Sequence, residues 1–146
     1  MPRPLFQVKQ LFFDRPKVRK AVDQGTRRVL SRFGAFVRTK ARDLTKKRPA
    51  KRQRTSDPGQ PPRRHTGVLR RLIFFAYEPE RRTVVIGPAK IHGSPDSPTI
   101  PEVLEHGGRT KLSSGARARI AARPYMGPAM RDELPKLPQM WRDSVR

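Results

Sequence analysis

The sequence contains no cysteine, only 12 acidic residues and no long apolar run, and each absence removes a class of protein. Without cysteine the chain has no disulfide, no thiol nucleophile and no thiolate ligand for a metal. No stretch approaches the ~18 consecutive apolar residues of a membrane-spanning helix, so we expect no membrane partner. Pro2, Pro4 and the early charges leave no apolar centre for a secretory leader, and we expect none.

The few acidic residues are outnumbered by 34 Lys and Arg, which gives a formal net charge of +22 in 146 residues. Such an excess is far more than solubility requires, and a polyanion or an acidic partner must neutralise it. Only 34% of the residues are hydrophobic, so the core must be small. We therefore expect a single domain over residues 1–146 that is marginal alone and stabilised by its neighbours.

A long helix and a basic arm are predicted for the first half of the chain. Asp14 can cap a helix, Pro16 fits its first turn, and apolar residues then recur every three or four positions, which predicts a helix over 15–47. Prolines are frequent from there to position 62 and forbid a helix. Residues 46–66 are therefore predicted to form a basic flexible arm, disordered when alone.

Three segments have the pattern of strands. Apolar and polar residues alternate over 5–13, which predicts a first strand. Two apolar runs within 72–87, joined by residues 78–82, predict an antiparallel hairpin. Residues 123–126 are predicted to form a last short strand. We expect these strands to make one small antiparallel sheet.

Two further helices are predicted after the hairpin. Residues 100–106 form a short helix that two glycines end, and residues 128–142 form a C-terminal helix that Pro135 and Pro138 kink or divide. The stretch 109–122 is basic and fits either a loop or a weak hairpin. The fold class is therefore α+β: a small antiparallel sheet packed against one long helix, with a long basic loop and a C-terminal helix.

Patterns of catalytic and metal-binding residues are missing. The three histidines have no metal-site spacing, and the nucleophile elbow and the phosphate-binding glycine loops do not occur. A metal cluster of Glu102, Glu105 and His106 is conceivable, but a short acidic helix with a histidine at its negative end is the simpler interpretation. We expect neither enzymatic activity nor a metal or other cofactor.

Basic residues are concentrated between the end of the long helix and the hairpin. Arginine binds phosphates in a bidentate way, and no motif for reading bases occurs, so contact would be with phosphates alone. The residues predicted to contact a polyanion or an acidic partner are Arg38, Arg42, Lys46, Lys47, Arg48, Lys51, Arg52, Arg54, Arg63 and Arg64.

Aromatic residues form a second candidate set. Those of the hairpin could stack on bases, but apolar neighbours favour a place in the core or at a subunit interface. The residues predicted for the core or an assembly interface are Phe74, Phe75, Tyr77, Tyr125 and Trp141.

Five short motifs occur in a fixed order along most of the chain. They are Pro58-Gly59-Gln60-Pro61-Pro62, His65-Thr66-Gly67-x-Leu69-Arg70-Arg71-x-Ile73, Val85-Ile86-Gly87-Pro88, Pro101-x-x-Leu104-Glu105-x-Gly107-Gly108 and Ala122-Arg123-Pro124-Tyr125-Met126-x-Pro128-Ala129. The ordered set resembles the neck or tail-completion proteins, which join head and tail in long-tailed bacteriophages.

The resemblance implies a long helix against an antiparallel sheet and a structural role in the virion. It implies a homo-oligomeric ring, with six as the expected number of copies, at the head–tail neck and around or near the DNA channel. The implied partners are other copies, neighbouring neck and tail proteins, and packaged double-stranded DNA through its phosphates, after assembly in the host bacterial cytoplasm. The family has no catalytic residues to transfer.

Two alternatives stay open at this point. The basic arm can meet DNA or acidic surfaces of the next ring. Charge alone also fits a non-specific nucleic-acid-binding module associated with ribosomes or the nucleoid.

Overall fold

The structure is a computed structural model that describes residues 14–90, 99–111 and 114–144. It confirms the α+β class, with a long N-terminal helix, antiparallel strands and C-terminal helices. The strand predicted over residues 5–13 lies outside the described residues.

The central element is helix α1 (Arg15–Leu44), about 45 Å long at 1.5 Å per residue. The Asp14 carboxylate accepts the backbone N–H of Lys17 at 3.1 Å, so the predicted cap is confirmed. The helix ends three residues before the predicted position 47. The cause is Thr45, whose hydroxyl donates to the carbonyls of Ala41 and Arg42 at 3.1 Å and so closes the last turn.

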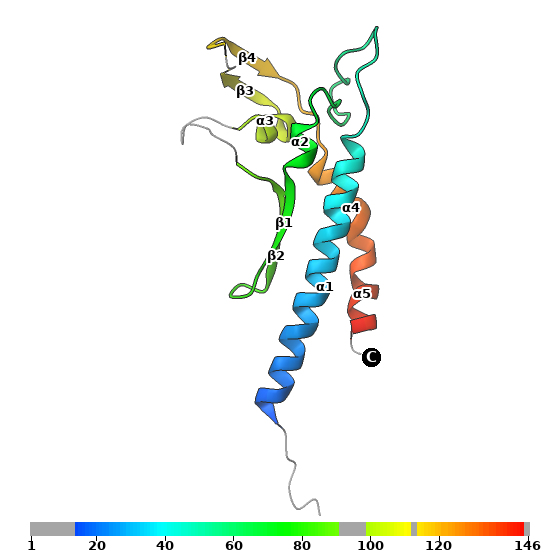
Figure 1. The fold of residues 1–146 in the computed structure, drawn as a ribbon, viewed down its shortest axis with the longest axis vertical. Coiled ribbons are helices and arrows are strands. Elements are labelled where there is room, and N and C mark those ends of the chain that lie inside the picture. The colour runs from blue at the N-terminus through cyan, green and yellow to red at the C-terminus, as the bar shows by residue number, and fades with distance from the viewer. Residues whose placement is uncertain (1–13, 91–98, 112–113, 145–146) are drawn as a thin grey trace, which may run out of the picture.

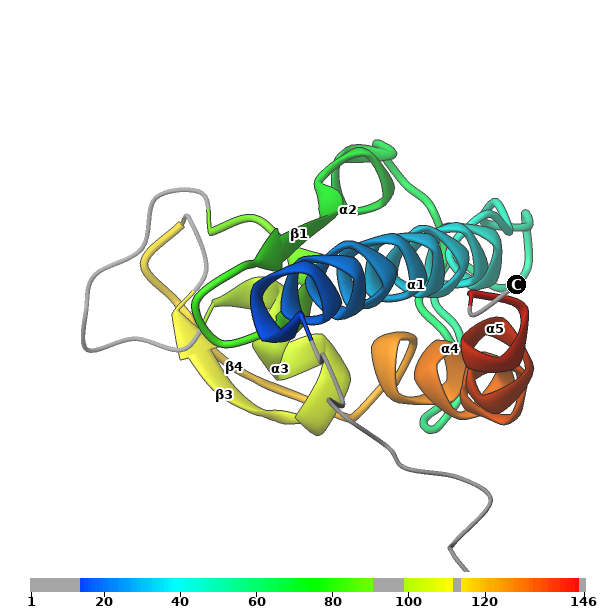
Figure 2. The ribbon, with the colours of Figure 1, turned by 90° about the horizontal axis from the view of Figure 1, so that it is seen from below.

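Helix α1 is packed on two sides. Strands β1 (Ile73–Glu78) and β2 (Thr83–Pro88) lie along one side, and the C-terminal helices lie along the other (Figures 1 and 2). The predicted hairpin is confirmed, with Phe75 opposite Ile86.

A glycine allows the hairpin to approach the helix closely. A Cβ atom at Gly34 would lie 2.8 Å from Cγ2 of Val84 and 2.9 Å from Cδ2 of Phe75. Side chains alternate across a strand, so Phe75 points towards α1 while Phe74 points away and is 49% exposed.

The basic stretch 109–122, whose sequence fitted either a loop or a weak hairpin, forms a second hairpin. Helix α3 (Ile100–His106) ends at Gly107, whose φ of 75° is in the left-handed region, and β3 (Gly108–Lys111) pairs with β4 (Arg117–Ile120). The small antiparallel sheet predicted against the long helix is β1–β2, and β3–β4 adds a second two-stranded sheet, where we had expected one sheet. One face of β3–β4 carries cations, so a helix cannot cover that face as α1 covers β1–β2.

The C-terminal helix is divided, as its prolines predicted. It consists of α4 (Met126–Glu133), the 3₁₀ turn η1 (Leu134–Lys136) and α5 (Leu137–Ser144), with Pro135 and Pro138 at the starts of the last two.

The strand predicted over residues 123–126 is wrong. The backbone N–H groups of Tyr125 and Met126 donate to the carboxylate of Glu105 rather than to a neighbouring strand, and α4 begins at Met126.

The core lies where the C-terminal half of α1 meets the other elements. Its buried residues are Phe33, Val37, Ala41, Ile73, Tyr125 and Ala129. On α1 burial begins only at Thr26, although the apolar pattern begins at Val18, which is 42% exposed. The first turns of α1 therefore extend beyond the core (Figure 1).

Candidate polyanion-binding surface

Residues 46–66, called the basic loop from here on, contain no helix and no strand beyond an isolated bridge between Ala50 and Gln53. The irregular backbone agrees with the proline pattern, but the loop is not the free arm that we expected. One backbone hydrogen bond closes the loop on itself, from the N–H of Arg64 to the carbonyl of Lys47 at 2.8 Å. Two others hold it to the segment before α4: the N–H of Gly59 donates to the carbonyl of Ala122 at 2.8 Å, and the Nε of Arg123 donates to the carbonyl of Ser56 at 3.1 Å.

The exposed cations of the basic loop form the candidate surface. They are Lys46, Lys47, Arg48, Lys51, Arg52 and Arg54. Asp57 is the only acid of the loop, and its carboxylate accepts the amide of Gln53. In the described part of the chain, no carboxylate lies within ion-pair distance of these six side chains. Their charge is therefore available to an external anion.

Two of the predicted contact residues have a different role. The Nε of Arg38 donates to the carbonyl of Ile73 at 3.0 Å, and the guanidinium of Arg42 donates to the carbonyls of Arg71 and Ile73 at 3.1 and 3.2 Å. Both side chains therefore fasten the start of β1 to α1. Burial, together with the charges of Arg38 and Arg70, lowers the pKa of the Arg42 guanidinium from its ordinary value.

The last two predicted cations line the inner side of the loop. Arg63 is half-buried and donates to the carbonyl of Arg48 and the side-chain oxygen of Gln53. Arg64 is also half-buried and borders a cavity of about 320 Å³ between the loop and α2 (Val68–Arg71). The loop thus has a structural inner row and an exposed outer row of cations.

The aromatic candidates separate into core and surface residues. Tyr125 is fully buried in the core, and Phe75 packs on α1. Tyr77 borders a groove beside α1, whereas Phe74 and Trp141 are 49% and 37% exposed. Burial and then the charge of Glu105 raise the pKa of the Tyr125 phenol well above its ordinary value.

The carboxylate of Glu105 has a role that the sequence pattern did not indicate. It accepts the backbone N–H groups of Tyr125, Met126 and Gly127 at 2.8, 2.9 and 2.7 Å, which caps the N-terminus of α4. Among the described residues no group of three His, Asp or Glu side chains is placed to hold a metal ion. The sequence pattern gave no sign of the Glu105 cap, because Glu105 and the start of α4 are about twenty positions apart in sequence.

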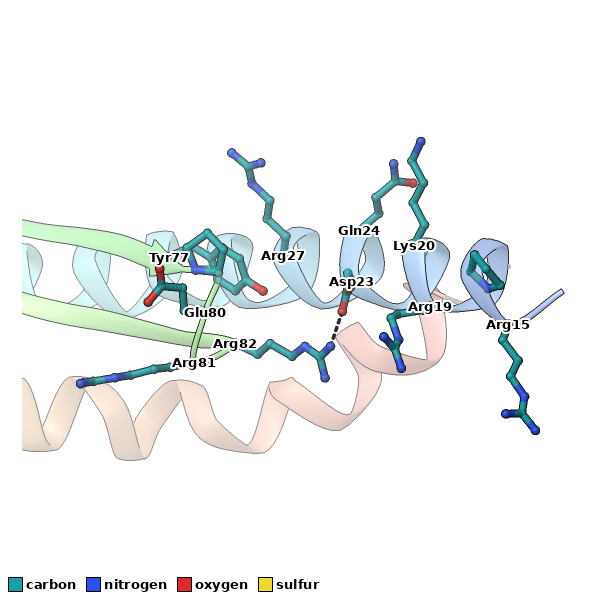
Figure 3. A pocket seen from close by; sticks show the side chains of 12 residues that line it. Arg15, Arg19, Lys20, Asp23, Gln24, Arg27, Tyr77, Glu80, Arg81 and Arg82 are labelled. Carbon is teal, nitrogen blue, oxygen red and sulfur yellow. Dashed lines mark ion pairs between the residues drawn. The ribbon is translucent and has the colours of Figure 1, made fainter.

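A groove of about 950 Å³ lies between the first turns of α1 and the turn of the β1–β2 hairpin (Figure 3). Its charged lining residues are Arg15, Arg19, Lys20, Asp23, Arg27, Glu80, Arg81 and Arg82. Figure 3 shows Arg82 reaching Asp23, at 3.0 Å, while Lys20 and Arg27 project from α1 on a different side from Arg15. The cations of the groove therefore do not converge on one point.

A further basic cluster, which we had not singled out, lies on the β3–β4 hairpin. Its four cations are Arg109, Lys111, Arg117 and Arg119, and all are exposed. The signal was a cation at every second position on both sides of a glycine turn, which is the period of a strand.

Comparison with known proteins adds no further constraint. No family model, no curated protein and no solved structure matches this chain. Within residues 14–90, 99–111 and 114–144, no helix has both the length and the apolar character needed to cross a membrane.

Proposed function

We propose that this protein is a structural subunit of the phage head–tail joint, a neck or tail-completion protein whose copies form a ring around or near the DNA channel. The observation that carries the proposal is the ordered set of five motifs, since several of their residues have a definite role in the conformation of the chain.

The glycines of the motifs stand where the backbone requires them. Gly59, Gly67 and Gly107 have φ values of 81°, 79° and 75°, which residues other than glycine rarely adopt. Gly67 directly precedes α2 and Gly107 directly follows α3, so a shared motif implies a shared chain path at these points.

The other motif residues tie these turns to the core. Glu105 caps α4, and Tyr125 and Ala129 are fully buried beside α1. The motifs therefore specify the packing of one end of the molecule, which supports a common fold with the proteins that the sequence resembles.

The β1–β2 hairpin supports a role in assembly. Its outer face exposes Phe74 and Val85, at 49% and 54%, and in the described residues neither strand pairs with a third strand. Unpaired strand edges and an exposed apolar face are typical of surfaces that a neighbouring subunit covers. The hairpin is thus the surface on which we expect another copy to pack.

Deletion of the gene from the source phage tests the proposal. Electron microscopy of the lysate should show DNA-filled heads beside unattached tails. Normally joined particles, or purified particles that lack the protein by mass spectrometry, would refute the head–tail role.

The second candidate function is non-specific nucleic-acid binding, which the unpaired cations of the basic loop favour. It predicts that free protein binds DNA or RNA with a steep dependence on salt and a defined site size. Binding that merely follows total charge, without a site size, would count against it.

A further inference from the structure

The β3–β4 hairpin places like charges directly opposite each other. In its antiparallel register Arg109 is opposite Arg119, and Lys111 is opposite Arg117. Directly paired residues share one face and have Cβ atoms about 5 Å apart. The four cations therefore form a two-by-two array on one face, called the cationic face from here on.

The opposite face of the hairpin points into the molecule. Thr110 is 7% exposed, and Ala118 and Ile120 are half-buried. Side chains alternate along a strand, so burial of these three residues confirms that the cationic face is turned to solvent.

This array destabilises the free protein. Like charges opposite each other on paired strands are unfavourable, and an isolated two-stranded sheet is marginal even without them. In the portion of the chain with described coordinates, no carboxylate is within ion-pair distance of any of the four cations. The described residues therefore leave these four charges for another molecule to neutralise.

We propose that the cationic face of the β3–β4 hairpin binds the phosphates of a nucleic acid duplex. A regular array of cations with no acid and no apolar side chain among them matches a repeating phosphate backbone. An acidic protein surface would bring apolar groups that this face cannot bury. A two-stranded ribbon also has the width that the major groove of B-form DNA admits.

The position of the hairpin permits this contact. It lies beyond α3, on the side away from α1, and projects from the rest of the fold (Figure 1). The inference does not depend on the head–tail role, because a phosphate site on this hairpin serves either of the two functions above.

The test compares two variants of the full chain that lose four positive charges each. The hairpin variant carries Arg109→Gln, Lys111→Gln, Arg117→Gln and Arg119→Gln. The control variant carries Gln at four exposed cations scattered over α1, α4 and α5, which are Lys17, Arg28, Arg131 and Arg142. Binding to a fluorescein-labelled DNA duplex of about 20 base pairs, two helical turns, is followed by anisotropy over a range of salt concentrations.

We expect the hairpin variant to bind the duplex at least tenfold more weakly than the native protein. The magnitude of the negative slope of log K against log salt should fall by about 3. The control variant should lose much less affinity and much less of the slope. An equal loss in the two variants, or no loss in the hairpin variant, would overturn the proposal. A hairpin variant that loses binding to poly-glutamate but keeps binding to the duplex would instead assign the face to an acidic partner.

A second measurement separates binding from misfolding. Removal of the opposed charges should leave the unliganded hairpin variant at least as stable to heat as the native protein. Its amides at 108–111 and 117–120 should exchange more slowly. Lower stability of both this variant and the double variant Arg109→Gln/Arg119→Gln would show that the cations support the fold, and would overturn the proposal.

Discussion

Glu105 shows how one side chain can join two elements that are distant in sequence. Its carboxylate is the acceptor for three successive backbone N–H groups at the start of α4. Those of Tyr125 and Met126 are partly buried, so water cannot fully replace the acceptor.

Glu105→Ala should therefore lower the free energy of unfolding by about 2–3 kcal/mol, the cost of unsatisfied donors together with a lost cap. Glu102→Ala is the matched control on the same helix, because Glu102 is exposed and should cost under about 0.5 kcal/mol. Urea denaturation followed by circular dichroism measures both. Similar losses in the two variants would contradict the capping role.

At the scale of elements, the contact between α1 and the β1–β2 hairpin depends on the absence of one side chain. Gly34→Ala should destabilise the protein by about 1–2 kcal/mol, because its Cβ would meet Val84 and Phe75 below 3.0 Å and the hairpin must shift.

Gly25→Ala is the matched control on the same helix, since nothing lies within 4 Å of its Cβ position. It should stabilise the protein by up to about 1 kcal/mol through helix propensity alone. Thermal unfolding of both variants gives the signs. Two stabilising substitutions would show that the hairpin does not pack on Gly34.

The two faces of strand β1 should respond differently to charge. Phe75→Asp should prevent folding, because it places a carboxylate against α1, whereas Phe74→Asp should leave the monomer folded. If a second copy packs on the outer face, Phe74→Asp should also abolish self-association in analytical ultracentrifugation. A folded Phe75→Asp protein that only fails to assemble would assign Phe75 to the interface instead.

At the scale of the whole molecule, the positive charge lies mostly on surfaces rather than in ion pairs. Replacement of Arg48, Lys51, Arg52 and Arg54 by Gln should leave the fold intact, since their side chains are exposed and make no contact that holds the loop. Under the proposed head–tail role, phage with this variant should assemble poorly or lose DNA. An unchanged infectious titre would rule out that use of the basic loop.

The elements that depend on residues close together in sequence could be predicted from the sequence. The start of α1 at Asp14 and Pro16, the hairpin, α3, the divided C-terminal helix and the irregular basic loop all rest on caps, periodicity or proline, which act within a few residues. The exposed cations of the basic loop were predicted for the same reason, because a run of charges in an irregular segment has no covering element.

Contacts between distant segments did not follow from the sequence. Arg38 and Arg42 were predicted to face a polyanion, but they bind carbonyls at Arg71 and Ile73, about thirty residues further along the chain. Two small sheets formed instead of one, and Glu105 became a cap rather than part of an acidic helix surface. Local patterns show which residues can be buried or charged, whereas the partner of a buried donor or a long arginine depends on how the chain closes on itself. That closure is set by the sum of many weak contacts around α1, and no single segment of sequence contains it.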